Sequence, residues 1–197
     1  IRTARATGEI MVVLVTASPV FPSKNNFVKA LRNIHPQITT VVQNVNGRNT
    51  SMVLGEKEHV LYGPGFIVDR LCGCRFRISA KSFYQVNPIQ TEVLYQKATE
   101  AAGLTGKQTV VDAYCGIGTI GIAAASRARE VIGVELNRDA VRDAITNARM
   151  NKVRNIRFYC NDEGKFMTQM ASQGAKADVV FLDPPRSGSR EEFIEAV

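Results

Sequence analysis

The chain has 197 residues, of which 45% are hydrophobic and 22% charged, and its formal net charge is +7. This composition excludes an intrinsically disordered chain, and no apolar run reaches the ~18 residues that a membrane-spanning helix needs. Its four cysteines are too few and too scattered for a disulfide scaffold, so we expect a cytoplasmic protein. Most of the excess positive charge lies in residues 1–102, which favours that half as the binding surface for a polyanion.

Residues 1–85 have the pattern of a small α+β lobe. Two β-branched apolar stretches, 9–18 and 38–45, predict strands, and the apolar spacing between them predicts a helix. Residues 66–72 predict a third strand and residues 75–81 a fourth. We therefore expect a first domain over residues 1–85.

The strand expected at 75–81 has a basic outer face. Its apolar residues occupy every second position, and Arg75, Arg77 and Lys81 lie among the positions between them. This alternation is typical of a half-buried antiparallel strand. We expect the basic face to contact RNA phosphates, and a plain solvated face is the alternative.

Residues 86–197 change to a regular alternation of strands and helices. A helix is expected at 89–102, and then four apolar strands, each leading into a helix, at 108–114, 130–136, 155–160 and 177–183. Such strands predict a parallel sheet covered on both faces, a doubly wound α/β domain whose ligand binds at the carboxyl ends of the strands. The chain begins without Met and stops inside a helix expected from residue 190, so we expect a piece of a longer protein with a truncated sheet.

A glycine-rich loop follows the first parallel strand. Gly116, Gly118 and Gly121 spell G-x-G-x-x-G, and Glu135 ends the next strand about 20 residues after the first glycine. The glycines let the backbone approach a ligand closely, and the carboxylate can accept hydrogen bonds from a ribose diol. NAD and S-adenosylmethionine both carry such a ribose, so the loop itself is consistent with either cofactor.

Two further carboxylates favour S-adenosylmethionine. Asp112 ends the first parallel strand, where it would repel a pyrophosphate and attract an ammonium or sulfonium group. Asp183 ends the fourth strand, and Pro184 and Pro185 then give a rigid, extended turn at the same edge of the sheet. The simpler interpretations are a turn-forming role for Asp183 and a helix-terminus role for Glu135.

These motifs together resemble the RNA (uracil-5-)-methyltransferases of the RumA/TrmA type. The resemblance rests on Ser-Phe-Tyr-Gln-Val-Asn-Pro at 82–88, Asp-Ala-Tyr-Cys-Gly-Ile-Gly-Thr at 112–119, Gly-Val-Glu at 133–135, Asn-Ala-Arg-Met-Asn at 147–151 and Leu-Asp-Pro-Pro-Arg-Ser-Gly at 182–188. It is weaker over residues 1–81. It implies a class I, Rossmann-like methyltransferase domain over residues 86–197 that uses S-adenosylmethionine to form 5-methyluridine, in 23S rRNA rather than tRNA.

The resemblance also implies roles for single residues. It assigns cofactor binding to Gln85, Tyr114, Gly116, Gly118, Thr119, Glu135, Asp162 and Asp183. Glu135 is expected to bind the ribose, Asp162 to lie near the adenine, and Asp183 to close the site beside the methionine end. A helix-entry role for Gln85 and core packing for Tyr114 are the simpler alternatives.

In this family a cysteine thiolate adds to C6 of uracil and a general base later removes the C5 proton. Both residues are expected beyond Val197, so the chain is expected to bind cofactor without transferring a methyl group. Cys115 belongs to the glycine loop and is expected to pack inward, and Cys160 is expected to be structural. Cys72 and Cys74 form a lone pair, so no metal site is expected.

The expected partner is a structured RNA, because base chemistry requires the target to leave its stack. Arg186, beside the site, is expected to contact RNA together with Arg75, Arg77 and Lys81. Three other functions stay open: an amino-methyltransferase, a nicotinamide oxidoreductase and a non-catalytic RNA-binding module. The first of these usually has an aromatic residue after the two prolines, where this chain has Arg186.

Overall fold

The computed structural model describes residues 1–48 and 52–196, and the chain divides into two compact units. Unit 1 comprises Ile1–Arg70 and Arg77–Lys81, and unit 2 comprises Leu71–Phe76 and the chain from Ser82 onward. Each unit has its own sheet and its own hydrophobic core. Residues 71–76 pack with unit 2, a feature that a single division after residue 85 does not describe.

Unit 1 is built on a four-stranded sheet in the order β1-β2-β3-β4. Its elements are β1 (Arg2–Thr3), β2 (Ile10–Thr16), α1 (Lys24–Ile34), β3 (Ile38–Val45) and β4 (Lys57–Tyr62). The central strands β2 and β3 run parallel, with α1 between them in the chain, and β1 and β4 pair antiparallel at the edges. Val28 of α1 packs against Ile38 and Val41. The strands and helix expected here are confirmed. Strand β4 was not predicted, because half of its residues are polar and none is buried, so it lacks an apolar pattern.

A two-stranded hairpin follows, formed by β5 (Phe66–Leu71) and β6 (Cys74–Ser79). Its two turn residues, Cys72 and Gly73, have φ angles of 51° and 75°. Two positive φ angles in a two-residue turn match the twist of an antiparallel hairpin. The side chains that the sequence placed on the inner face of β6 are buried, which confirms the predicted alternation.

Unit 2 contains a second four-stranded sheet, in which all neighbours run parallel in the order β10-β7-β8-β9. Its strands are β7 (Thr109–Ala113), β8 (Glu130–Glu135), β9 (Ile156–Cys160) and β10 (Val179–Leu182). Its helices are α2 (Pro88–Ala101), α3 (Thr119–Ala124) with the short 3₁₀ turn η1 (Ala125–Arg127), α4 (Arg138–Met150), α5 (Glu163–Ser172) and α6 (Glu191–Ala196). The predicted Rossmann-like α/β fold is confirmed.

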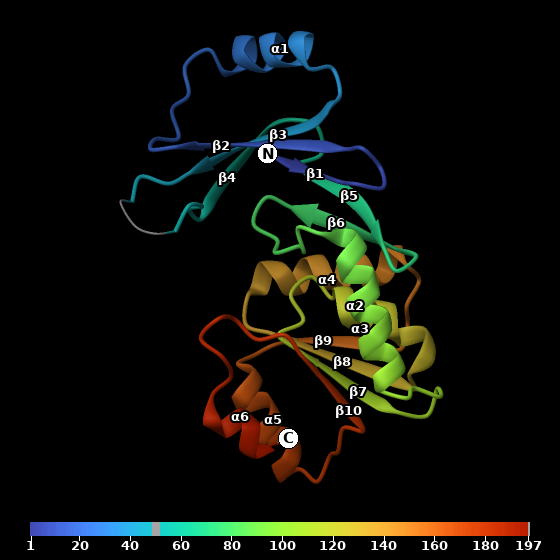
Figure 1. Cartoon of the computed structure of the whole chain (residues 1–197). Coiled ribbons are helices and arrows are strands. Elements are labelled where there is room, and N and C mark those ends of the chain that lie inside the picture. The colour runs from blue at the N-terminus through green and yellow to red at the C-terminus, as the bar shows by residue number, and fades with distance from the viewer. Residues whose placement is uncertain (49–51, 197) are drawn as a thin grey trace. The chain divides into compact units, whose positions relative to one another are not determined.

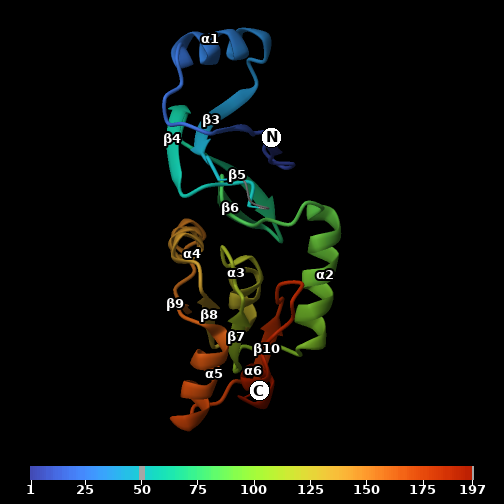
Figure 2. The same ribbon diagram turned by 90° about the vertical axis from the view of Figure 1, so that its left-hand side faces the viewer.

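The two faces of this sheet have separate cores. Val110, Val131 and Phe181 pack with α3, whereas Val111 and Val134 pack with α5 and α6. Figures 1 and 2 show α3 and α4 over one face of the sheet and α5 and α6 over the other. Because strand residues alternate between faces, Asp112 lies on the same face of β7 as Val110, toward α3. The apolar character of the central strands β7 and β8 thus follows from their burial under helices, whereas the edge strand β9 has no buried residue.

Side chains fix the amino ends of the helices that follow the strands. Asn137 accepts a hydrogen bond from Asp139 N (2.9 Å) at the start of α4, and Asp162 accepts one from Lys165 N (3.1 Å) at the start of α5. Such caps satisfy free N–H groups and define where each helix begins. None of the described helices is long and apolar enough to cross a membrane.

Candidate functional site

The loop after β7 has an unusual backbone. Tyr114, Gly116 and Gly118 have φ angles of 60°, 54° and 82°, in the left-handed region. An added Cβ would meet nothing within 4 Å at Gly116, whereas at Gly121 it would lie 2.8 Å from Asp112 Oδ2. The first glycine therefore leaves the backbone accessible to a ligand, and the last lets α3 approach β7 closely.

Glu135 joins the glycine loop to the end of β8. Its Oε2 accepts a hydrogen bond from Gly116 N at 3.0 Å, and its Oε1 accepts one from Asn137 N at 2.7 Å. These bonds hold a partly exposed carboxylate beside the accessible backbone of Gly116. Each carboxylate oxygen can accept more than one hydrogen bond, so the group can still receive a ligand hydroxyl.

Asp112 is the most deeply buried acid of the site, with 1% of its surface exposed. Its Oδ2 accepts a hydrogen bond from Gly121 N at 2.8 Å, but Oδ1 has no partner among the described residues. Burial raises the pKa of this carboxyl to about 7, and the nearby Asp183 and Glu135 add to the rise. The site therefore concentrates negative charge around an incompletely satisfied carboxyl, an environment that favours a cationic ligand.

Tyr95 of α2 is a site residue that the sequence analysis missed. Its hydroxyl lies 2.9 Å from the hydroxyl of Thr119, at the start of α3. Burial raises the pKa of Tyr95 to about 12, so it stays neutral and fixes the Thr119 side chain. No motif pointed to Tyr95, because an aromatic residue on a helix face is indistinguishable in sequence from core packing.

The structure brings Gln85 and Asp183 together, although they are 98 residues apart in the chain. Gln85 Nε2 lies 3.5 Å from Asp183 Oδ2, at the long limit of a hydrogen bond. Asp183 is exposed at the carboxyl end of β10, and Gln85 is half-buried just before α2. The pair belongs to the same edge of the sheet as the glycine loop.

A cavity of about 360 Å³ opens beside Tyr114, Leu136 and Asp162. Asp162 Oδ2 lies 3.4 Å from Arg190 Nη1, and Arg190 lines the same cavity. Tyr114 also packs against Phe193, with ring centroids 6.1 Å apart. Tyr114 thus contributes both to the cavity wall and to the α6 side of the core.

Glu163 and Arg190 are further residues of this cavity that sequence reasoning missed. Burial raises the pKa of Glu163, and Glu135 and Asp162 raise it further. Arg190 was not predicted as a site residue. It lies after the Asp-Pro-Pro-Arg motif, and no sequence pattern there indicates its contact with Asp162.

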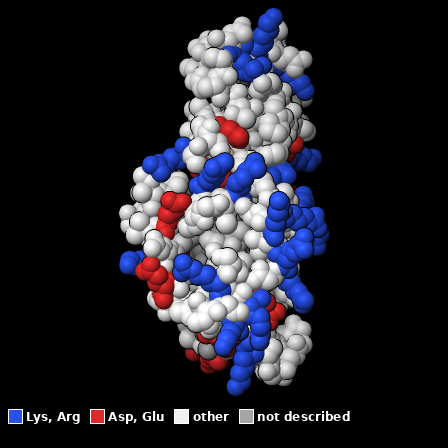
Figure 3. Space-filling model, turned by 90° about the vertical axis from the view of Figure 1, so that its right-hand side faces the viewer, with Lys and Arg blue, Asp and Glu red and all other residues white. Residues whose placement is uncertain are grey.

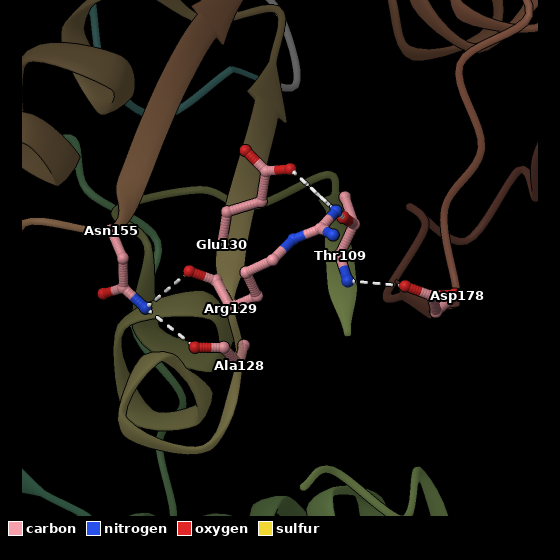
Figure 4. A network of polar contacts seen from close by, with 6 residues as sticks. All are labelled: Thr109, Ala128, Arg129, Glu130, Asn155 and Asp178. Carbon is pink, nitrogen blue, oxygen red and sulfur yellow. Dashed lines mark hydrogen bonds and ion pairs between the residues drawn. The ribbon is translucent and has the colours of Figure 1, made fainter. Parts of the chain in front are cut away.

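The amino-terminal edge of the sheet, shown in Figure 4, carries contacts that hold the strands together. Asp178 Oδ2 accepts a hydrogen bond from Thr109 N at 2.7 Å. The guanidinium of Arg129 donates to Thr109 Oγ1 and lies 3.4 Å from Glu130 Oε1. Asn155 Nδ2 donates to carbonyl oxygens in the turn before β8.

A larger cavity, of about 570 Å³, is lined by Arg129, Tyr159, Phe166 and Lys176, among others. None of the eight predicted cofactor residues lines it. We therefore place the candidate site at the carboxyl edge of the sheet, where the glycine loop and the carboxylates meet.

The four cysteines are free thiols that differ in exposure. Cys115 is buried, and burial raises its pKa well above the usual value, with nearby acids adding to the rise. Cys160 is exposed, and its Sγ lies 3.5 Å from Leu136 O. Within the part of the chain that the structure describes, no group of three His, Cys, Asp or Glu side chains is placed to hold a metal ion.

The four predicted RNA-binding residues differ in their surroundings. Arg77 stacks over the Phe66 ring, 4.3 Å from its centroid, and Lys81 Nζ donates to Glu56 O at 2.5 Å. Both side chains are thus engaged within unit 1. Arg75 and Arg186 belong to unit 2, and both are exposed.

Relatives align with the whole chain. An uncharacterized RNA methyltransferase of Halalkalibacterium halodurans is 45% identical over 196 residues, and one of Oceanobacillus iheyensis is 43% identical over 197 residues. Both alignments cover 100% of this chain but 43% of the relative, so the chain spans less than half the length of these curated proteins.

Solved structures share the fold. The crystal structure of Pyrococcus abyssi tRNA (uracil-54, C5)-methyltransferase in complex with S-adenosyl-L-homocysteine has a TM-score of 0.78 and 27% identity, and the match covers 99% of this chain and 45% of that one. A SAM-dependent methyltransferase candidate from Streptococcus mutans has a TM-score of 0.56 and 16% identity, covering 89% of this chain and 46% of that one. The second likeness concerns the fold alone.

The comparison with family models corrects the family expected from the sequence. The model that matches is described as Conserved hypothetical protein 95, and it covers residues 91–197. The prediction of the RumA/TrmA-type RNA (uracil-5-)-methyltransferase family was wrong. Two of its five motifs lie at the carboxyl ends of β7 and β10, the edge at which this fold binds ligands, and families that share a fold can share residues there. Because the matched segment covers more than half of its length, the chain belongs to the Conserved hypothetical protein 95 family.

Proposed function

We propose that the chain is the cofactor-binding part of an S-adenosylmethionine-dependent RNA methyltransferase. The observation that carries this proposal is the buried Asp112 carboxyl, whose Oδ1 has no partner among the described residues. Asp183 and Glu135 lie close enough to contribute to the raised pKa of Asp112, so a positive ligand would relieve the repulsion among the three. S-Adenosylmethionine carries an ammonium and a sulfonium group, and when bound it supplies an electrophilic methyl group.

The residues of the site fit the parts of this cofactor. We assign Glu135 to the ribose, because its carboxylate is held beside the accessible backbone of Gly116. The Gln85 and Asp183 pair suits the methionine end, where an amide and a carboxylate can bind an ammonium and a carboxylate group. Asp162, beside the cavity of about 360 Å³, suits the adenine. Gly118, Thr119 and Tyr114 shape the loop between them.

A nicotinamide cofactor fits this site poorly. Its pyrophosphate would have to bind at the glycine loop, close to the carboxylates of Asp112, Glu135 and Asp183. Repulsion between these carboxylates and a pyrophosphate disfavours binding. The glycine loop itself contains no Lys or Arg that would offset this repulsion. The choice between the two cofactors thus rests on charge.

An RNA acceptor is supported by the relatives, which carry the name RNA methyltransferase and align with the whole chain. Uridine C5 is the acceptor we propose. Its support is the likeness to the Pyrococcus abyssi enzyme, a tRNA (uracil-54, C5)-methyltransferase. The sequence analysis favoured 23S rRNA, so both tRNA and rRNA belong in the test.

The cofactor proposal is tested by calorimetric titration of the chain with S-adenosylhomocysteine and, in parallel, with NADH. We expect saturable binding of the first ligand, weakened at least tenfold by Glu135→Gln. The matched control is Glu130→Gln, because Glu130 lies at the amino end of the same strand and contacts Arg129 rather than the glycine loop. Binding of NADH without S-adenosylhomocysteine, or equal losses in both variants, would contradict the proposal.

The acceptor is tested in cells that lack the gene. Nucleoside analysis of purified tRNA and rRNA is expected to show the loss of 5-methyluridine from one of the two RNAs. Loss of an N-methylated nucleoside instead would point to the amino-methyltransferase alternative. Unchanged RNA in both fractions would argue for a non-catalytic RNA-binding module.

A further inference from the structure

The carboxyl end of α4 carries a group of exposed cations on unit 2. Arg149 lies in the last turn of the helix, and Lys152 and Arg154 follow in the loop that leads to β9. Arg75, near the start of β6, is also exposed and belongs to the same unit. We call these four residues the α4 platform.

Arg75 is tied to the end of α4 by a reciprocal pair of hydrogen bonds. Asn151 Nδ2 donates to Arg75 O at 2.6 Å, and Arg75 N donates to Asn151 Oδ1 at 2.8 Å. Asn151 directly precedes Lys152 and terminates the helix, since its N–H donates to Asn147 O at 3.1 Å. The backbone of Arg75 is therefore joined to the end of α4, although the two bonded residues are 76 positions apart in the chain.

The backbone under these cations is fixed by further hydrogen bonds. Lys152 has a left-handed φ of 57°, and its N–H donates to Arg149 O at 3.0 Å. Val153 N donates to Ala148 O, also at 3.0 Å. Bonds of this kind satisfy the free carbonyls at a helix end and define the path of the chain. Backbone hydrogen bonds therefore fix the positions of the residues that carry these cations.

The charges of the α4 platform are not neutralised locally. Among the described residues, no carboxylate forms an ion pair with any of its four side chains, whereas Arg142 is paired with Asp139 at 3.1 Å. Figure 3 shows Lys and Arg side chains gathered along the right-hand side of the view, with few acidic ones among them. The α4 dipole accounts for a basic residue in the last turn, but it does not account for Arg75 or Arg154.

Arg157 is not part of this surface, although it follows closely in sequence. Its neighbour Phe158 points toward Gly133 and Cys115, on the α3 side of the sheet. Arg157 and Tyr159 alternate with it, and Tyr159 contacts Phe166 of α5, on the opposite side.

We propose that the α4 platform docks the phosphate backbone of RNA. This inference rests on the proposed function, because it names a second surface by which the same enzyme would hold its acceptor. Four cations without local partners bind phosphates by releasing counterions, and such contacts set position rather than read sequence. Because α4 runs from the carboxyl edge of the sheet back to its amino edge, the α4 platform lies roughly 20 Å, the length of this helix, from the cofactor site. It would hold an RNA arm at that distance while the target base enters the cofactor site.

The test is RNA binding by the 197-residue chain, measured as fluorescence anisotropy of a labelled RNA hairpin with a uridine-containing loop. In the variant Lys152→Gln/Arg154→Gln we expect roughly tenfold weaker binding near 0.1 M salt. The plot of log affinity against log salt concentration should become less steep by about 2, because each lost phosphate contact removes about one unit of slope.

The control variant is Lys107→Gln/Arg127→Gln, which removes the same charge from exposed positions elsewhere on unit 2. Equal losses in the two double variants, an unchanged slope in the first, or no binding of the hairpin by the parent chain would overturn the proposal. Titration of the same proteins with S-adenosylhomocysteine tests cofactor binding separately from RNA docking. One outcome is that S-adenosylhomocysteine binds all of these proteins equally and that RNA affinity is unchanged in the Lys152 and Arg154 variant. The docking proposal would then be wrong, and the cofactor proposal would stand.

Discussion

At the scale of single residues, Asp112 links the chemistry of the site to its stability. The carboxyl is buried, one oxygen has no partner among the described residues, and two other acids lie nearby. Its ionised form is therefore costly in the ligand-free protein and becomes favourable when a cation binds. Proton binding and ligand binding at this position oppose each other.

The pH dependence of stability is expected to reveal this residue. The folded chain raises the pKa of Asp112 from the usual 3.8 to about 7, so between those pH values the folded state holds a proton that the unfolded state has released. The contribution of Asp112 to the free energy of unfolding therefore falls as pH rises from about 4 to about 7 and is constant above. Thermal unfolding of Asp112→Asn should lack this component, and an identical pH profile in the parent and variant would refute the assignment.

At the scale of elements, β8 and β9 meet over Gly133. A Cβ at this position would lie 2.5 Å from Phe158 Cδ1 and 3.1 Å from Cys115 Sγ. The glycine is required by this close approach rather than by its backbone angles, because its φ is not positive. It keeps the ring of Phe158 packed beneath the glycine loop.

We expect Gly133→Ala to lower the free energy of unfolding by about 1–3 kcal/mol, because the methyl group would overpack this contact. Adding Phe158→Leu should recover part of the loss. Gly164→Ala in α5 is the control, since its nearest neighbour would be 3.3 Å away and alanine favours helices. Urea denaturation measures all four proteins, and a Gly133→Ala variant as stable as the parent would show that the strands can move apart freely.

Asp162 has a structural role in α5 that can be separated from its proposed role in the site. Asn caps helices as well as Asp does, so Asp162→Asn should keep the stability of the parent, whereas Asp162→Ala should lose about 1 kcal/mol. The ion pair with Arg190 spans 3.4 Å and its arginine side chain is exposed, so we expect it to add little to either value. Denaturation combined with S-adenosylhomocysteine titration distinguishes the roles, and equal destabilisation by both substitutions would contradict the capping role.

At the scale of the whole molecule, the parts that could be predicted from sequence are those encoded by local patterns. The four strands of unit 2 are mostly apolar, and the glycine loop and Asp183 mark the carboxyl ends of β7 and β10. Strand β4 carries no such pattern because it is an exposed edge strand. Tyr95, Glu163 and Arg190 join the site through tertiary contacts alone, which no spacing in the sequence reveals.

Whether the 197-residue chain can transfer a methyl group by itself is also a question about the whole molecule. Uracil methylation of the proposed kind needs a thiolate, and Cys115 is poorly suited to this role because it is buried and burial raises its pKa. We expect the 197-residue chain to bind S-adenosylhomocysteine yet to transfer no methyl group from radiolabelled S-adenosylmethionine to tRNA or rRNA transcripts. Recovery of labelled 5-methyluridine would show that the described residues contain a complete catalytic centre.

The assignment of residues 71–76 to unit 2 means that the polypeptide crosses between the units three times. Within unit 2 this segment is held by Glu92, whose Oε1 accepts from Cys72 N at 2.7 Å, and by the Asn151 contact with Arg75. Dissection at a single peptide bond therefore cannot yield unit 2 intact. A protein starting at Ser82 would lose these contacts and is expected to unfold at a lower temperature than one starting at Leu71.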